Sequence, residues 1–454
     1  MCTAVRRTTT STVLVMVTCA VAVLLGFVNK ARCAGAPFAE NGRSLDFDRL
    51  KNTTACYSDI QMLWIGRDLD LHAFPYVGGG ITGDGTLTGG TVEYPVLSGL
   101  LMWLGSIGAH TDAEFLLHSA MLLAPFALLT AWMLGRLARK WAFLWSATPP
   151  LVLYAFHNWE LPVVATAVAA VFVMTFDRIP LRTRGVLAAV LLAVGFCLKL
   201  YPGIFVLPLA VYVLTHGDLR RRTGYDVRGA VQVGMAAVGT VVAVNLPFML
   251  LSYSGWRASI TFQQNRKADL NTNSIWYWGL RPLFGPEPDS LALSYDQVVA
   301  VASPLLVCAT FALAMRLGWL RYLREGTFPW IAVSGGMLCG FLLFHKVHSP
   351  QYTLWLIPFF VLLRVPWATV AAYLTVDVVL GLGVFKYFGA LASFTDAGGY
   401  EAVVKTSVWA RAALLVVLFY TFVHASLRSE PEAGEGNSPD RGGPAVVAEP
   451  QPVP

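Results

Sequence analysis

The stretch VRGAVQVGMAAVGTVVAVNLPFMLL, residues 227–251, has apolar residues on all sides of a helix, and its few polar residues are Arg228, Gln232, Thr240 and Asn245. A run of this length predicts a helix that crosses a bilayer. Similar runs of about 20 residues recur along the chain, which is 56% hydrophobic and 13% charged, with a mean hydropathy of +0.58. The alternating pattern of a membrane β-barrel is absent. We therefore predict an all-α polytopic membrane protein.

The lysines and arginines lie in short clusters between the apolar runs, with a net charge of +6. Clusters of this kind orient helices in a bilayer and are not typical of nucleic-acid binding. The cytoplasmic side is expected to hold Arg6 and Arg7, Arg136, Arg139 and Lys140, Arg178, Arg182 and Arg184, Arg220 to Arg222, Arg316, Arg321 and Arg324, and Arg364. When the apolar runs are oriented so that these basic clusters stay in the cytoplasm, the sequence predicts about twelve spans with both ends of the chain inside.

The expected organisation is one transmembrane domain, residues 11–426, between two short ends. Residues 1–10 are predicted to be cytoplasmic, and the apolar run that follows is read as an uncleaved first span, with a cleaved signal peptide as the alternative. Residues 427–454 are rich in Pro, Gly and Glu, which predicts a disordered cytoplasmic tail.

Residues 30–112 form a long, Gly-rich, polar segment on the predicted outer side. Such long loops are usually functional or disordered. The large anchors Trp64, Phe74 and Tyr76 favour a folded loop with short interfacial helices. The apolar run after Pro95 is too short to cross comfortably, so we expect an interfacial or re-entrant helix, with a true span as the alternative.

Asp59 lies within CYSDIQMLWIGRDLD, residues 56–70 of this loop. Ile60, Met62, Leu63 and Trp64 follow it as one apolar face of a short helix, which would hold the carboxylate at the membrane interface. A base acting on a lipid-linked substrate needs that depth. Asp59 is therefore the candidate catalytic base.

The other unusual polar motifs are predicted to lie on the same outer face. They contain Glu93 and Tyr94; His157, Asn158 and Glu160; Lys199 and Tyr201; Arg266 and Lys267; and His345, Lys346, His348 and Gln351. Each has an ordinary structural explanation, such as a helix-terminal acid, an interfacial turn or a snorkelling lysine. The functional alternative is substrate binding, in which the cations neutralise a phosphate.

Cysteine and histidine spacing indicates no metal site. Cys33 and Cys56 both fall in the outer loop, and a disulfide between them would anchor the Asp59 segment. No nucleotide-binding motif is present either, so a sugar donor would have to be membrane-borne.

Five motifs, in order CYSDI, EYPVL, FHNWE, KLYPGIFVLP and KVHSPQYTLWLIP, resemble those of glycosyltransferase family 87 over residues 12–425. This family contains actinobacterial membrane enzymes of the GT-C type, including polyprenol-phosphate-mannose-dependent α-mannosyltransferases. The resemblance implies a GT-C fold with a long first extracytoplasmic loop, and it makes Asp59 the catalytic aspartate. It also implies an active-site histidine in HKVHSPQY, which is His345 or His348.

The function expected from the resemblance is transfer of a sugar, mannose in the best-known members, from a polyprenyl-phosphate donor to a glycolipid or polysaccharide. The site would face outward from the plasma membrane, and the only partners needed are the bilayer, the donor and the acceptor, without a cofactor. The alternative is a transporter or flippase of glycolipid precursors, for which Asp377 inside an apolar run would be a typical residue. A non-enzymatic assembly factor for envelope polymers is the third reading.

Overall fold

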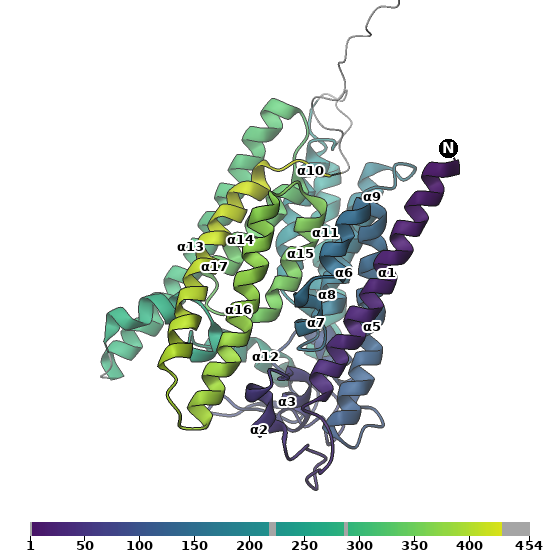
Figure 1. The fold of residues 1–454 in the computed structure, drawn as a ribbon. Helices are drawn as coiled ribbons and strands as arrows, with labels where there is room; N and C mark the ends of the chain where they lie inside the picture. The colour runs from purple at the N-terminus through teal and green to yellow at the C-terminus, as the bar shows by residue number, and fades with distance from the viewer. Residues whose placement is uncertain (1, 218–223, 286–288, 429–454) are drawn as a thin grey trace, which may run out of the picture.

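The computed structural model describes residues 2–217, 224–285 and 289–428, and this part of the chain is mostly helical (Figure 1). Seven of its helices are long and apolar enough to cross a membrane. They are α1 (Cys2–Ala31), α5 (Asp112–Ala138), α9 (Leu181–Leu198), α11 (Val227–Leu251), α13 (Asp289–Glu325), α16 (Trp367–Ala392) and α17 (Gly398–His424). The chain is therefore a multi-pass helical membrane protein, as predicted.

Shorter apolar helices of 10–17 residues pack among the long ones. They are α4 (Val96–Ser106), α8 (Glu160–Val173), α10 (Val206–Leu214) with the 3-10 turn η2 (Tyr201–Phe205), α14 (Trp330–Phe344), and α15 (Thr353–Leu362) with η6 (Pro350–Tyr352). A straight span needs about 20 residues. The expected number of about twelve spans depends on these short helices and stays a prediction.

The remaining elements are small. They are α2 (Phe47–Thr53), α3 (Asp59–Gly66), β1 (Gly80–Ile81), β2 (Leu87–Thr88), η1 (Arg139–Ala142), α6 (Phe143–Ser146), α7 (Pro149–Tyr154), α12 (Tyr253–Asn265), η3 (Leu270–Thr272), η4 (Trp276–Leu280) and η5 (Arg281–Phe284). The strands pair antiparallel, with Gly80 opposite Thr88.

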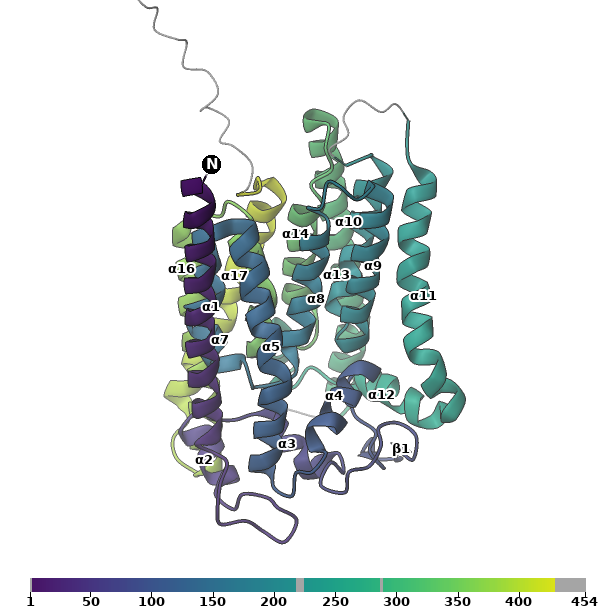
Figure 2. The same cartoon turned by 90° about the vertical axis from the view of Figure 1, so that its right-hand side faces the viewer.

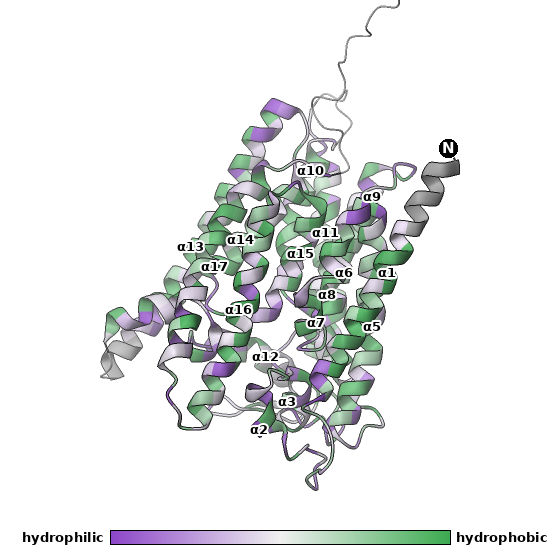
Figure 3. Ribbon diagram, in the orientation of Figure 1, coloured by the Kyte–Doolittle hydropathy of each residue, from purple (hydrophilic) through white to green (hydrophobic). Residues whose placement is uncertain are grey.

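Helix α11 occupies the 25 residues that the sequence predicted as one span. It begins where the side chain of Asp226 accepts a hydrogen bond from the backbone N–H of Gly229 at 3.0 Å, which satisfies a donor of the first turn. Only 17% of its apolar window is buried. Its apolar surface, like that of α13, is therefore left for lipid (Figure 3).

The charge rule assigns one of the expected spans to residues 141–154, and this assignment is wrong because no single helix occupies them. The chain is divided there into η1, α6 and α7, and α7 starts at Pro149. Proline lacks the N–H needed inside a helix but suits its first turn, so Pro149 and Pro150 end one helix and begin the next.

The basic loops meet at one end of the bundle. Arg428 lies over the Trp141 ring at 3.6 Å. Leu363 and Leu427 form an isolated antiparallel β-bridge, and Arg321 donates to the carbonyl of Ala425 at 2.7 Å. The N-terminus lies at this same end (Figure 2). The grouping expected from charge is therefore present, although which side of the membrane this end faces stays a prediction.

The outer-loop elements α2, α3, α4 and β1 lie together with α12 at the opposite end (Figure 2). Cys33 and Cys56 form a disulfide that joins the end of α1 to the segment before α3. Residues 30–112 are thus a folded cap on the bundle, and α4 belongs to it. The predicted disordered tail falls almost entirely in residues 429–454, and the basic cluster at 220–222 also lies outside the described residues.

Candidate active site

Asp59 is the first residue of α3, and its backbone is tied to a turn between α7 and α8. Its N–H donates to the carbonyl of His157 at 2.8 Å. The neighbouring Ser58 caps α3 and donates its hydroxyl to the carbonyl of Phe156 at 2.6 Å. These bonds join residues about a hundred positions apart in the chain. They hold the backbone of Asp59 in place, and so they set the position from which its side chain extends.

Two donors orient the carboxylate of Asp59. The hydroxyl of Tyr57 donates to Oδ1 and the side-chain amide of Asn158 donates to Oδ2, each at 2.7 Å. Asn158 is itself fixed, because its Oδ1 accepts from the N–H of Trp159 at 2.6 Å and its Nδ2 also lies 2.7 Å from the hydroxyl of Tyr94. A carboxylate accepts about four hydrogen bonds, so each oxygen keeps a free lone pair.

Burial raises the pKa of Asp59 above its ordinary value. The hydrogen bonds from Tyr57 and Asn158 and the charge of Lys199 act in the opposite direction, but they do not cancel the effect of burial. The side chain is only half-buried. The site therefore holds a carboxylate that is a stronger base than one in water and is still accessible.

Glu160 and Lys199 form an ion pair beside this group. Glu160 is fully buried, and its second oxygen accepts from the indole N–H of Trp355 at 2.6 Å. The ammonium of Lys199 also lies 5.1 to 5.6 Å from the rings of Tyr94, Tyr352 and Trp355. Lys199 is thus neutralised by a carboxylate and enclosed by aromatic rings.

A second set of cations lies around the end of α12. Arg266 follows α12, and its charge acts on Tyr57, Tyr94, His345 and Lys346. None of the salt bridges formed by the described residues includes Arg266. Its guanidinium is therefore a cation near the Asp59 network that no carboxylate of the described residues pairs with.

Lys346 and His345 accompany Arg266. Lys346 donates to the carbonyl of Gln264 in α12 at 3.0 Å. His345 stacks on Phe341, with ring centroids 4.7 Å apart, and burial lowers its pKa to about 4. At neutral pH the imidazole is neutral, so Arg266 and Lys346 carry the charge of this cluster.

Two other predicted binding residues are engaged elsewhere. The carboxylate of Glu93 pairs with Arg67 at 2.6 Å, and its carbonyl accepts from Gln263 at 2.7 Å. Lys267 pairs with Asp296 at 2.6 Å, with 65% of its side chain exposed. Glu93 links the cap to α12 through Gln263, whereas the side chain of Lys267 lies exposed on the protein surface.

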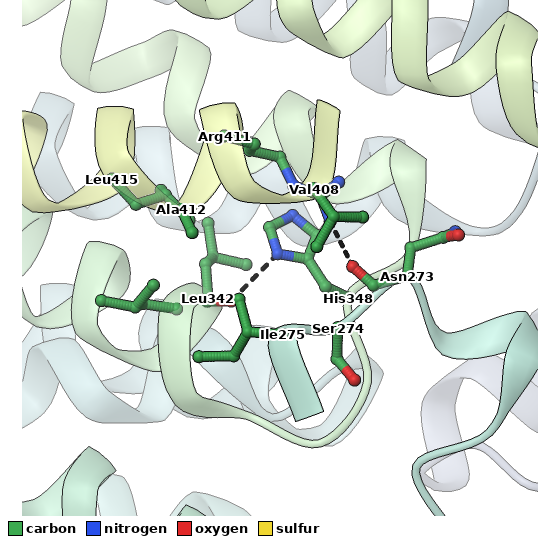
Figure 4. Close-up of a pocket in the computed structure, with 10 residues that line it drawn as sticks. Asn273, Ser274, Ile275, Leu342, His348, Val408, Arg411, Ala412 and Leu415 are labelled. Carbon is green, nitrogen blue, oxygen red and sulfur yellow. Dashed lines mark hydrogen bonds between the residues drawn. The ribbon is translucent and has the colours of Figure 1, made fainter. Parts of the chain in front are cut away.

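His348 lies in a different environment from His345. It is buried, and its backbone N–H donates to the carbonyl of Thr272 at 2.7 Å. The ring Nδ1 lies 2.9 Å from the carbonyl of Leu342. Figure 4 shows its ring in a small pocket opposite Arg411 of α17. Burial lowers the pKa of His348 well below its ordinary value, so this histidine is neutral as well.

The remaining predicted residues are packing groups around these clusters. His157 is buried against the rings of Tyr57 and Phe385, at 5.4 and 6.1 Å. Tyr201 stacks on Trp355 at 4.3 Å. Gln351 is buried without a partner for its Oε1 among the described residues.

Asp377, the residue typical of a transporter, lies buried in α16. It accepts a hydrogen bond from the hydroxyl of Thr353 in α15 and interacts electrostatically with Arg411. It lies in the same interior region as His348 and has no recorded contact with Asp59 in the described part of the chain.

Sequence reasoning did not single out Tyr57 or Trp355. Tyr57 lies two positions before Asp59, within the quoted motif, so proximity was the available signal. Trp355 is 195 positions from Glu160 and resembles an interfacial tryptophan until the chain is folded. Arg67 lies in the same quoted motif, and nothing in the sequence indicates that it pairs with Glu93.

Metal ligands are not assembled in the described ranges. No group of three or more His, Cys, Asp or Glu side chains there is placed to hold an ion. The prediction that no metal is needed stays a prediction.

Comparisons with known proteins find little. No protein-family model and no curated protein matches the chain. Among solved structures, the crystal structure of the Archaeoglobus fulgidus oligosaccharyltransferase in the apo form is similar at 11% sequence identity and a TM-score of 0.39. The match covers 87% of this chain, which spans 56% of that protein.

Proposed function

We propose that the protein is a membrane glycosyltransferase of the GT-C type that uses a polyprenyl-phosphate sugar. The observation that carries the proposal is the half-buried carboxylate of Asp59, oriented by Tyr57 and Asn158. The guanidinium of Arg266, which forms no salt bridge within the described ranges, acts on the same tyrosine. A base and a cation at one membrane face are what transfer from a lipid phosphate requires.

The reaction is a single displacement. A hydroxyl of the acceptor gives its proton to Asp59 while its oxygen forms a bond to C1 of the sugar. The bond from C1 to the phosphate oxygen breaks, and its electron pair leaves with the polyprenyl phosphate. Attack opposite the leaving group inverts the configuration, so a β-linked donor gives an α-linked product, without a protein nucleophile.

The leaving phosphate gains one negative charge in this step, which cations stabilise. Arg266 and Lys346 are suited to this role because neither pairs with a carboxylate in the described part of the chain. The neutral ring of His345 would contact the phosphate by a hydrogen bond. Lys199 is less suited, because Glu160 already neutralises it.

The Glu160 and Lys199 pair supports the base in another way. The charge of Lys199 lowers the pKa of Asp59, and its side chain packs on Tyr94, which contacts Asn158. Tyr94 and Asn158 therefore connect the pair to the carboxylate. We expect these residues to position Asp59.

The specific substrates follow from the family resemblance. Mannose is the expected sugar, a glycolipid or polysaccharide of the cell envelope is the expected acceptor, and the site would face outward from the plasma membrane. The bilayer brings the donor laterally to the cap, and no cofactor takes part.

The experiment is transfer of radiolabelled mannose from polyprenyl-phosphate mannose into the lipid and polymer fractions of membranes. Wild-type membranes should transfer label with inversion, and Asp59→Asn membranes should lose transfer. Asp70→Asn is the matched control, because Asp70 lies in the same loop outside the network and should stay active. Transfer that persists in Asp59→Asn would remove Asp59 as the base, whereas label that crosses the bilayer chemically unchanged in both proteins would favour the transporter.

A further inference from the structure

Arg411 is a fully enclosed arginine in the middle of α17. Only 2% of its surface is exposed, and it lies inside a helix that crosses the membrane. A charge at that depth is costly, and such residues usually have a specific role. Asp377 acts on Arg411 electrostatically, but the recorded hydrogen bond of its guanidinium goes elsewhere.

That hydrogen bond reaches the outer-face loop. Nη2 of Arg411 donates to the backbone carbonyl of Asn273 at 2.6 Å, across 138 positions of sequence (Figure 4). Asn273 is buried and has a φ of +47°, a left-handed conformation that asparagine adopts more readily than most other residues with a side chain. The arginine therefore holds the carbonyl of a residue at a sharp turn of the loop.

The loop around Asn273 is also tied to the segment that carries His345 and Lys346. The backbone N–H of His348 donates to the carbonyl of Thr272 at 2.7 Å, and the indole N–H of Trp276 donates to the carbonyl of Phe344 at 2.8 Å. Lys346 closes the arrangement at the other end through Gln264. Residues 264–276 and 344–348 are thus one clamp, and Arg411 anchors it to α17.

The position of the cations depends on this clamp. Arg266 and Lys346 come from the two segments that the clamp joins, so their separation depends on how those segments are held together. We infer that Arg411 is a positioning residue that holds the two segments in register, and thereby sets the geometry in which Arg266 and Lys346 bind a phosphate. The inference rests on the proposed role of these cations.

Two readouts separate this role from general support of the fold. The first is amide hydrogen exchange of the full-length protein in nanodiscs, which needs no activity. In Arg411→Met, exchange should accelerate in residues 270–276 and 345–349 and stay unchanged in α3. The second is transfer kinetics, in which KM for polyprenyl-phosphate mannose should rise about tenfold or more while kcat stays within about twofold.

Arg321→Met is the matched control. Arg321 is also buried, and it also donates to backbone carbonyls at the C-terminal end of α17, those of Val423 and Ala425. Val423 lies twelve positions from Arg411, on the order of 18 Å along the helix. This variant should lose stability without changing donor KM or exchange in residues 270–276.

Arg411→Lys covers the case in which Arg411→Met does not fold, because a lysine keeps one donor and the charge. It should give intermediate exchange and an intermediate donor KM. Asn273→Gly keeps the carbonyl and favours the positive φ, so it should behave as wild type. The inference is overturned if exchange in the clamp is the same in wild type and the Arg411 variants, or if kcat falls while donor KM does not move.

The proposed function can fail separately. If the wild-type protein transfers no sugar, the affinity for polyprenyl phosphate alone replaces the kinetic readout. That affinity should be highest in wild type, intermediate in Arg411→Lys and lowest in Arg411→Met. Accelerated exchange with unchanged polyprenyl-phosphate binding would show that the clamp exists but does not serve the cations.

Discussion

The Glu160 and Lys199 pair gives a prediction whose size can be worked from its surroundings. Glu160 is fully buried and Lys199 has 14% of its side chain exposed. Breaking a buried pair by removing one partner costs about 3–5 kcal/mol, because the other charge is left without compensation. Removing both charges costs far less.

The two single variants should differ in size. In Glu160→Gln the ammonium keeps its three aromatic rings, so we expect a loss of about 3 kcal/mol in the free energy of unfolding. In Lys199→Met the carboxylate keeps only the indole of Trp355, so we expect a loss of about 4 kcal/mol. The double variant should lose no more than about 2 kcal/mol, because no buried charge remains.

The measurement is the free energy of unfolding in mixed micelles for the wild type, both single variants and the double variant. The exposed pair of Asp48 and Lys51 is the matched control, since the carboxylate side chain there is 72% exposed. Its removal should change stability by less than about 1 kcal/mol. If the loss in the double variant equals the sum of the losses in Glu160→Gln and Lys199→Met within about 0.5 kcal/mol, the two residues do not compensate each other, and the description of a buried ion pair is refuted.

Three further predictions concern the base, the cap and the cations. Tyr57→Phe removes a hydrogen bond that favours the ionised carboxylate, so the pKa of Asp59 rises and the acidic limb of a pH–kcat profile should move to higher pH; an unmoved limb would contradict this. Cys56→Ser opens a disulfide between residues 23 positions apart and should cost about 3 kcal/mol of stability, measured by denaturant unfolding without reductant; equal stability would show that the disulfide does not constrain the cap. Arg266→Gln should raise donor KM about ten- to hundredfold, whereas Lys267→Gln should leave it within about twofold, because Lys267 is exposed and paired with an acid; equal effects of the two variants would remove Arg266 from the phosphate site.

The sequence was sufficient to predict the helices and their grouping. The bounds of α11 were predicted to the residue because its apolar run ends at Asp226 and Ser252, which favour caps. Sorting by charge also placed Asp59 on the same face as the turn at His157, because lysine and arginine clusters orient every span that they flank.

The pairings within the site could not be predicted. Lys199 and Glu160 each looked like an available charge, and only the folded chain shows that they neutralise one another across 39 positions. His345 and His348 were equivalent in sequence. The backbone is extended at His345, so the two rings enter different environments, one beside Arg266 and the other beside Arg411.

The central claim is that Asp59 is the base of the transfer reaction. The most direct test is a comparison of kcat and of the affinity for polyprenyl-phosphate mannose between wild-type protein and Asp59→Asn, both purified in nanodiscs. The amide keeps the size of the side chain but cannot take the proton, so kcat should fall about 10²- to 10⁴-fold with donor affinity nearly unchanged. A variant that binds the donor normally and transfers at the wild-type rate would contradict the account.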